Sequence, residues 1–121
     1  MDKGTISIST NELKKWVDRE GRYHRDGGPA IEWVDGENHW YKHGKRHRLD
    51  GPATVYPNGD KYWYVDGRYH REDGPAVICA NGGGVKWWIN NVSFESKEEY
   101  FDTLSDEAKT KCLFSEDFLN G

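Results

Sequence analysis

The chain has 121 residues and a net charge of −4, and only 35% of its residues are hydrophobic, with six Trp and seven Tyr among them. This length predicts one domain. No stretch approaches the roughly 18 apolar residues of a membrane span and no signal-like segment opens the chain, so we expect it to be neither secreted nor membrane-spanning. The net charge is negative and the sequence has no stripe of Lys and Arg, which argues against direct nucleic-acid binding.

The N-terminal segment is expected to cap whatever follows it. Residues 4–9 alternate apolar and polar side chains as a short strand does. Residues 11–16 fit either one turn of helix or an irregular first strand. We therefore assign residues 1–15 to an N-terminal cap.

From residue 16 the chain repeats itself. The motif His-Arg-x-Asp-Gly-Pro-Ala occurs twice in full and once, at residues 24–30, with Gly in the Asp position. Its histidines His24, His47 and His70 lie 23 residues apart. A fixed period of this size is typical of stacked repeat proteins, in which each unit buries its apolar face against its neighbours. We expect three and a half units over residues 16–94.

Each unit also carries one hairpin signal. Asp35-Gly36, Asn58-Gly59 and Asn81-Gly82 supply the backbone freedom of a tight turn, between flanks rich in β-branched and aromatic residues. The motif then connects one hairpin to the next, with its proline at a strand start or edge. The predicted fold class is mainly β: an elongated, twisted antiparallel sheet of tandem hairpins.

The C-terminal segment, residues 95–121, is expected to form a short helical cap. Ser96-Lys97-Glu98-Glu99 is a capping box that opens a helix with Tyr100, Phe101 and Leu104 facing inward. Ser105 opens a second short helix that carries Ala108, Cys112 and Leu113. From residue 91 onward, eight acidic and three basic residues give a net charge of −5. This end is either a solvated cap or an acidic patch for a basic partner.

The recurring motif admits three roles, and two of them fit poorly. Equivalent histidines of neighbouring units would lie roughly 9–10 Å apart, twice the strand spacing, too far to share an ion that needs ligands at about 2.1 Å. Catalysis also fits poorly, because three identical motifs distribute their groups evenly, whereas an active site gathers different groups at one point. We expect no metal, no cofactor and no enzymatic activity.

The third role, a structural joint, is favoured. Arg can pair with the Asp of its own motif, His can give a ring N–H to a carbonyl, and Gly-Pro-Ala can bend the chain back into the sheet. Motif one departs from the pattern, with Gly27 in the Asp position, so either Asp26 substitutes or that turn is looser. Alternatively, the row of His-Arg pairs is a stripe that sequesters an anionic nucleotide. The motif residues are His24, Arg25, His47, Arg48, Asp50, His70, Arg71 and Asp73.

The repeat resembles a known family. Trp40-Tyr41-Lys42-His43-Gly44 and Tyr56-Pro57-Asn58-Gly59-Asp60 are similar to the two halves of a MORN-type repeat, which also has a 23-residue period. The resemblance covers roughly residues 16–94. Where the usual repeat continues with alternating glycines, this chain has His-Arg-x-Asp-Gly-Pro-Ala, which resembles a variant in small proteins of phages and large DNA viruses. The resemblance implies a scaffold or protein-binding surface, with lipid binding proposed for some members.

These observations together predict a non-catalytic protein-binding module. If the chain is phage-encoded, the expected role is inhibition of a host defence protein, for example an anti-CRISPR-like role. A homodimer through sheet edges or backs is also compatible. We expect a cytoplasmic location, in the host cell if phage-encoded, with Cys79 and Cys112 as reduced thiols. The candidate binding residues are the aromatics Trp40, Tyr41, Tyr62, Tyr64 and Trp88 and the acidic residues Glu98, Glu99 and Asp102.

Overall fold

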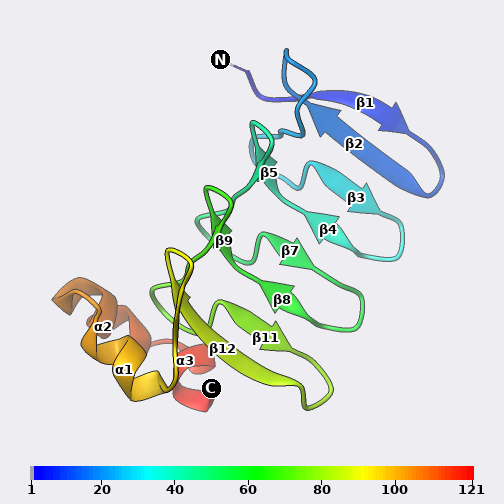
Figure 1. The fold of residues 1–121 in the computed structure, drawn as a ribbon. Helices are drawn as coiled ribbons and strands as arrows, with labels where there is room; N and C mark the ends of the chain where they lie inside the picture. The colour runs from blue at the N-terminus through cyan, green and yellow to red at the C-terminus, as the bar shows by residue number, and fades with distance from the viewer. Residues whose placement is uncertain (1) are drawn as a thin grey trace.

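The computed structural model describes residues 2–121 as a column of hairpins with helices at one end (Figure 1). Met1, the first residue of the predicted N-terminal cap, lies outside the described residues. The strands are β1 (Thr5–Ser9), β2 (Leu13–Val17), β3 (Ile31–Trp33), β4 (Asn38–His39), β5 (Tyr41–Lys42), β6 (Lys45–Arg46), β7 (Thr54–Val55), β8 (Lys61–Tyr62), β9 (Tyr64–Val65), β10 (Arg68–Tyr69), β11 (Val77–Cys79), β12 (Gly84–Ile89) and β13 (Val92–Phe94). The helices are α1 (Lys97–Asp102), α2 (Asp106–Leu113) and α3 (Glu116–Asn120).

The main sheet is antiparallel and confirms the predicted fold class. Its nine strands run in the order β1-β2-β3-β4-β7-β8-β11-β12-β13. The alternating residues 4–9 form β1, and residues 11–16, for which helix and strand were both open, contribute to the strand β2. The three predicted hairpins turn at Gly36, Gly59 and Gly82, whose φ angles of +100°, +99° and +81° favour glycine because it has no Cβ.

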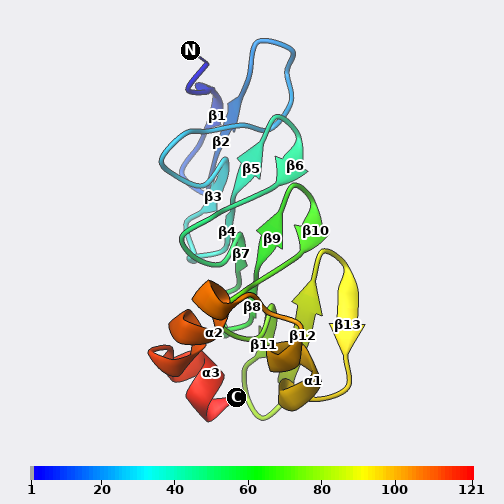
Figure 2. The ribbon, with the colours of Figure 1, turned by 90° about the vertical axis from the view of Figure 1, so that its left-hand side faces the viewer.

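A second set of small hairpins was not predicted. β5 pairs with β6, and β9 pairs with β10, in two separate two-stranded sheets. Their turns, His43-Gly44 and Asp66-Gly67, have positive φ at both positions, as a tight hairpin turn requires. Figure 2 shows β5–β6 and β9–β10 stacked in one column above β12–β13, the last hairpin of the main sheet. The turn dipeptide changes from His43-Gly44 to Asp66-Gly67, so no hairpin signal recurs at this position and the sequence predicts only a connector.

A full repeat unit therefore contains a small hairpin, a motif loop and a main-sheet hairpin, and in the first unit the small hairpin is reduced to the bridge between Val17 and Tyr23. We number the units by the tryptophan that opens them: unit one is residues 16–39, unit two 40–62, unit three 63–86 and partial unit four 87–94. The motif arginine lies over that tryptophan, with its guanidinium carbon 3.8, 3.9 and 3.9 Å from the ring centroid in units one to three. The core is thus a series of thin Trp–Arg layers. The motif alanines Ala30, Ala53 and Ala76 are fully buried between the layers.

The C-terminal cap has one helix more than predicted. Ser96, Ser105 and Ser115 are the N-caps of the three helices, and each side chain accepts a backbone N–H from the first turn. Tyr100, Cys112 and Phe118 form a buried cluster with Trp87, and Phe101 and Leu104 pack against it. Of the three residues predicted for the second helix, Ala108 and Cys112 are buried, whereas Leu113 is 58% exposed. It lies about 100° around α2 from the buried Cys112, since a helix turns by that angle per residue.

Two further predictions concern membrane spans and cysteines. Within residues 2–121, no helix is long and apolar enough to cross a membrane. Cys79 and Cys112 are both free thiols, the second one buried.

Candidate functional site

The motif histidines join successive units through their Nδ1 atoms. The backbone N–H groups of His43, Asp66 and Asn90 donate to Nδ1 of His24, His47 and His70, at 3.0, 3.0 and 3.1 Å. Since Nδ1 accepts, the ring proton is on Nε2. The predicted ring N–H donated to a carbonyl is found, within residues 2–121, at His24 alone, whose Nε2 lies 2.8 Å from the carbonyl of Asp2. Each imidazole sits in its own joint and the three do not converge.

The motif arginines are held on several sides. Besides stacking on tryptophan, Nη1 of Arg25, Arg48 and Arg71 donates to the carbonyl of the motif proline at 3.3, 3.2 and 3.1 Å. Nε of Arg48 and Arg71 donates to Asp50 and Asp73 at 2.9 and 2.8 Å. The predicted Arg–Asp pairing is therefore present in motifs two and three. The bond to Arg48 and its charge lower the pKa of Asp50 below its usual value.

Motif one replaces this carboxylate from an unexpected position. Arg25 pairs with Glu32 of β3 at 2.9 Å. Asp26, the expected substitute, instead lies 3.5 Å from Nε2 of His24. The positions equivalent to Glu32 in the other two units hold Val55 and Ile78. Glu32 therefore supplies the carboxylate that motif one lacks because Gly27 stands in its Asp position.

The glycine before each proline is required by the guanidinium. A Cβ at Gly28, Gly51 or Gly74 would lie 2.9, 2.8 or 2.8 Å from the guanidinium carbon of the motif arginine, closer than carbon atoms approach. These motif contacts are internal to the fold, and they account for the sequence Arg-x-Asp-Gly-Pro in physical terms.

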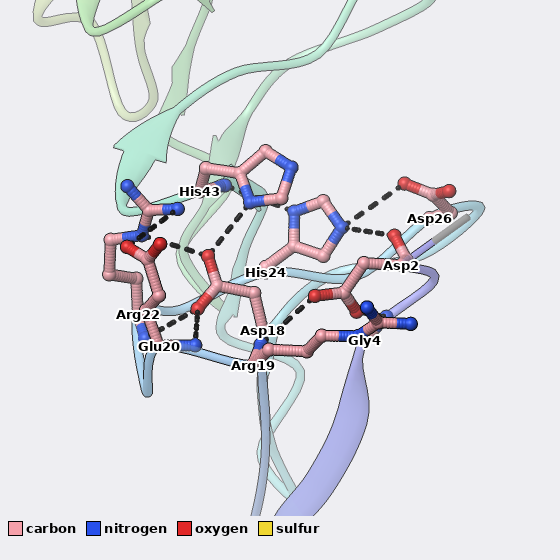
Figure 3. A network of polar contacts seen from close by, with 9 residues as sticks. All are labelled: Asp2, Gly4, Asp18, Arg19, Glu20, Arg22, His24, Asp26 and His43. Atoms are coloured by element: carbon pink, nitrogen blue, oxygen red, sulfur yellow. Dashed lines mark hydrogen bonds and ion pairs between the residues drawn. The ribbon is translucent and has the colours of Figure 1, made fainter.

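A buried carboxylate closes the N-terminal end of the stack (Figure 3). The side chain of Asp18 is 1% exposed and lies 2.7 Å from Nδ1 of His43 and 2.8 Å from Nε of Arg22. Burial alone would favour the protonated acid, but hydrogen bonds from His43, from Arg22 and from the Glu20 backbone hold the pKa of Asp18 well below its usual range. The ring of His43 stacks on that of His24, with centroids 3.9 Å apart.

Sequence reasoning did not single out Asp18 or His43. The sequence does contain a signal for an unusual turn here. Gly21 follows Trp16 by five positions, whereas the equivalent glycines of units two and three follow their tryptophans by four. Only the tertiary structure shows that this longer turn brings a carboxylate against the small hairpin of the next unit.

Four of the predicted binding aromatics gather in one column. Tyr64 and Trp88 lie 4.5 and 5.1 Å from Tyr69, ring centroid to ring centroid, and Tyr62 lies 6.5 Å from it. The guanidinium of Arg46 lies 5.5 Å from the Tyr41 ring and 5.7 Å from that of Tyr64. The column is half-buried rather than outward-facing. Burial and a hydrogen bond with Tyr69 raise the pKa of Tyr64.

The remaining predicted binding residues lie elsewhere. Trp40 is under the guanidinium of Arg48. Glu98, Glu99 and Asp102 are exposed on α1, where Glu99 also accepts the backbone N–H of Glu95. Sequence reasoning missed Arg46 and Tyr69, which link the column. They share the position before the motif histidine, so a comparison at the 23-residue period could have found them.

The motif loop of unit three is covered by the chain's own helices. Asp117 bonds Nη2 of Arg71 at 2.8 Å, and the hydroxyl of Tyr100 donates to the Arg71 carbonyl at 2.6 Å. The thiol of Cys112 contacts the carbonyl of Glu72 at 3.3 Å. As a result the side chain of Arg71 is 9% exposed.

The corresponding loops of units one and two are open. The side chains of Arg25 and Arg48 are 30% and 24% exposed. In Figure 2 these two loops lie above the helices, on the same side of the sheet. A cavity of about 360 Å³ lies between the loops of motifs two and three. Its lining includes Arg48, Leu49, Asp50, Arg71, Glu72, Asp73 and Lys111.

Comparison with known proteins gives no relative. No family model, curated protein or solved structure matches the chain. The resemblance to MORN-type repeats therefore stays a prediction. Over residues 2–121, no group of three or more His, Cys, Asp or Glu side chains could hold a metal ion.

Proposed function

We propose that this chain is a non-catalytic protein-binding module that uses the open Trp–Arg face of units one and two. One observation carries the proposal: helical polypeptide already covers the motif arginine in unit three, through Tyr100 and Asp117, while the side chains of Arg25 and Arg48 in the equivalent loops stay 30% and 24% exposed. Repeats present the same surface at each step, so what packs on one unit is a guide to what packs on the next. Exposed Arg and Trp are also the residues that most often anchor interfaces.

The alternative, capture of an anionic nucleotide by the His-Arg stripe, has less support. The imidazoles are committed to bonds between units, and Nε of Arg48 and of Arg71 is already paired with a carboxylate. In the cavity between motifs two and three, the basic Arg48, Arg71 and Lys111 stand beside three acidic residues, so their charges balance. A polypeptide suits this mixed surface better than a phosphate does.

The finer form of the proposal is an inhibitor that occupies the surface of a host defence protein. Its support is the resemblance to the repeat variant of phage and viral proteins. Its test is the activity of the captured partner, measured with and without the purified chain at equal molar ratio. Unchanged partner activity would count against inhibition and leave binding intact.

The experiment that tests binding is affinity capture with the full chain from extracts of the cells in which it acts, followed by mass spectrometry. The stoichiometry of the purified complex is measured by light scattering and its interface by hydrogen exchange. We expect one stoichiometric protein that protects the loops at residues 25–29 and 48–52. The proposal fails if there is no stoichiometric partner, or if protection is confined to other segments.

A further inference from the structure

We infer that Nη2 of Arg48 binds a carboxylate on an acidic segment of a protein partner, with Leu49 as the apolar contact beside it. This inference rests on the proposed protein-binding function and deepens it by assigning the chemistry of the partner. The recognised group is a side-chain carboxylate, presented by a polypeptide in the cavity between motifs two and three.

The chain contains its own example of this contact. Arg71 stacks on Trp63 and uses Nε for Asp73 and Nη1 for the proline carbonyl. Its remaining nitrogen, Nη2, takes Asp117 at 2.8 Å, from a helix 46 residues further along the chain. A charged hydrogen bond of this length is among the stronger ones in proteins.

Arg48 has the first three contacts and lacks the fourth. It stacks on Trp40 and donates from Nε to Asp50 and from Nη1 to the carbonyl of Pro52. Within residues 2–121, no acceptor is found for its Nη2. The stack and these two bonds fix the plane of the guanidinium, so Nη2 is held ready in the direction that Asp117 occupies in the next unit.

The surroundings of Arg48 distinguish it from Arg25. Arg48 lines the cavity of about 360 Å³, and Leu49, which also lines it, is 81% exposed. A partner that covers this exposed side chain would add apolar burial beside the charged contact, and burial of apolar surface is favourable. The nearby Asp50 does not prevent acid binding, because in unit three the equivalent Asp73 and the added Asp117 both pair with Arg71.

The test uses a defined probe, a synthetic peptide of residues 105–121, which carries Asp117. The full chain, labelled with ¹⁵N, is titrated with the peptide under reducing conditions. Binding is followed through the Nε–Hε signals of the arginines. We expect the Arg48 signal to shift, and the Arg48→Gln chain to bind at least about tenfold more weakly, as the loss of one charged hydrogen bond predicts. A peptide with Asp117→Asn should lose the same factor, and the two changes together should cost no more than either alone.

The control is Arg68→Gln, which removes an exposed arginine of β10 outside the motif loops and should leave peptide affinity unchanged. Thermal unfolding shows whether both variants are folded. Leu49→Ala, which leaves every motif hydrogen bond in place, should weaken binding by a smaller factor.

The inference is overturned if no binding is detected, if Arg48→Gln binds as the unchanged chain does, or if shifts are confined to unit three. If a partner is captured while the peptide test fails, only the Arg48 assignment is lost. If the peptide binds and no partner is captured, the proposed function is the part that fails.

Discussion

Units two and three have nearly the same motif and different surroundings. Both stack an arginine on a tryptophan at 3.9 Å and bind the proline carbonyl. In unit three, α2 and α3 cover the arginine, and in unit two it faces a cavity. The comparison shows that the motif builds the joint by itself, and that the helices add a layer which the upper units lack.

Partial unit four explains why the helices sit where they do. It has no motif arginine to cover its opening tryptophan, Trp87. The rings of Tyr100 and Phe118 lie 4.8 and 5.8 Å from the Trp87 ring and take over that role. The cap therefore replaces a missing Trp–Arg layer, which is what a terminal unit of a stacked repeat needs.

The largest expected loss of stability comes from removing an aromatic ring that covers Trp87. Phe118→Ala removes a buried ring from the cluster with Trp87 and Tyr100, and we expect the free energy of unfolding to fall by about 3–5 kcal/mol. The control is Phe114→Ala, because Phe114 is 87% exposed and its loss should change stability by less than about 0.5 kcal/mol. Urea unfolding of both variants measures the difference, and equal losses would contradict the role of the cap.

The next effect compares the two units directly. A Cβ at Gly74 or Gly51 would meet the guanidinium carbon of its own arginine at 2.8 Å in both cases. Arg71 has one contact more than Arg48, the bond to Asp117, and the cap covers it, whereas Arg48 borders the cavity. We expect Gly74→Ala to cost about 1–3 kcal/mol by overpacking, and Gly51→Ala to cost less. Thermal unfolding of the pair checks this, and the reverse order would show that unit three is not the more constrained.

A smaller effect isolates the polar contact between the cap and motif three. The hydroxyl of Tyr100 donates to the Arg71 carbonyl at 2.6 Å and accepts the Gly74 N–H at 3.2 Å. Tyr100→Phe keeps the ring and removes both bonds, so we expect a loss of about 1–2 kcal/mol from the buried groups left without a partner. Hydrogen exchange at Gly74 should accelerate by more than at Ala53, whose N–H donates to the carbonyl of Tyr62 away from the cap. Equal acceleration would mean a general loss of stability.

The last prediction concerns the opposite end of the stack. The pKa of Asp18 is lower in the folded chain than its ordinary value of 3.8, so the folded state holds its proton less readily than the unfolded state. The resulting stabilisation is complete above about pH 5 and is lost progressively as the pH falls below it. Asp18→Asn should therefore be less stable than the unchanged chain at pH 7 and should lose less on acidification. Parallel acid-dependence curves for the two chains would contradict this role of Asp18.

Much of the fold could be predicted because its signals are local and repeated. The turns at Gly36, Gly59 and Gly82 and the capping box at Ser96 depend on a few neighbouring residues. The 23-residue step then assigns each unit without further information. The pairing of Arg48 with Asp50 follows in the same way, since the two residues are neighbours in the motif.

The missed features depend on contacts between units. The hairpin β5–β6 turns at His43-Gly44, which lacks the Asn-Gly or Asp-Gly signal of the main-sheet turns. The burial of the short helix α3 depends on its contact with Trp87. The pairing of Arg25 with Glu32 joins a motif to a strand, so the loss of one carboxylate could be seen in the sequence and its replacement could not.

The sequence by itself determined the repeat, the position of its turns and the identity of its joints, because each of these requires residue types that only a few backbone geometries accept. The tertiary structure alone decided which arginine is covered and which is open. The docking of α3 on Arg71 joins residues 46 positions apart, and no local pattern encodes a contact over that separation. The difference between a covered Arg71 and an open Arg48 is therefore a property of the folded stack.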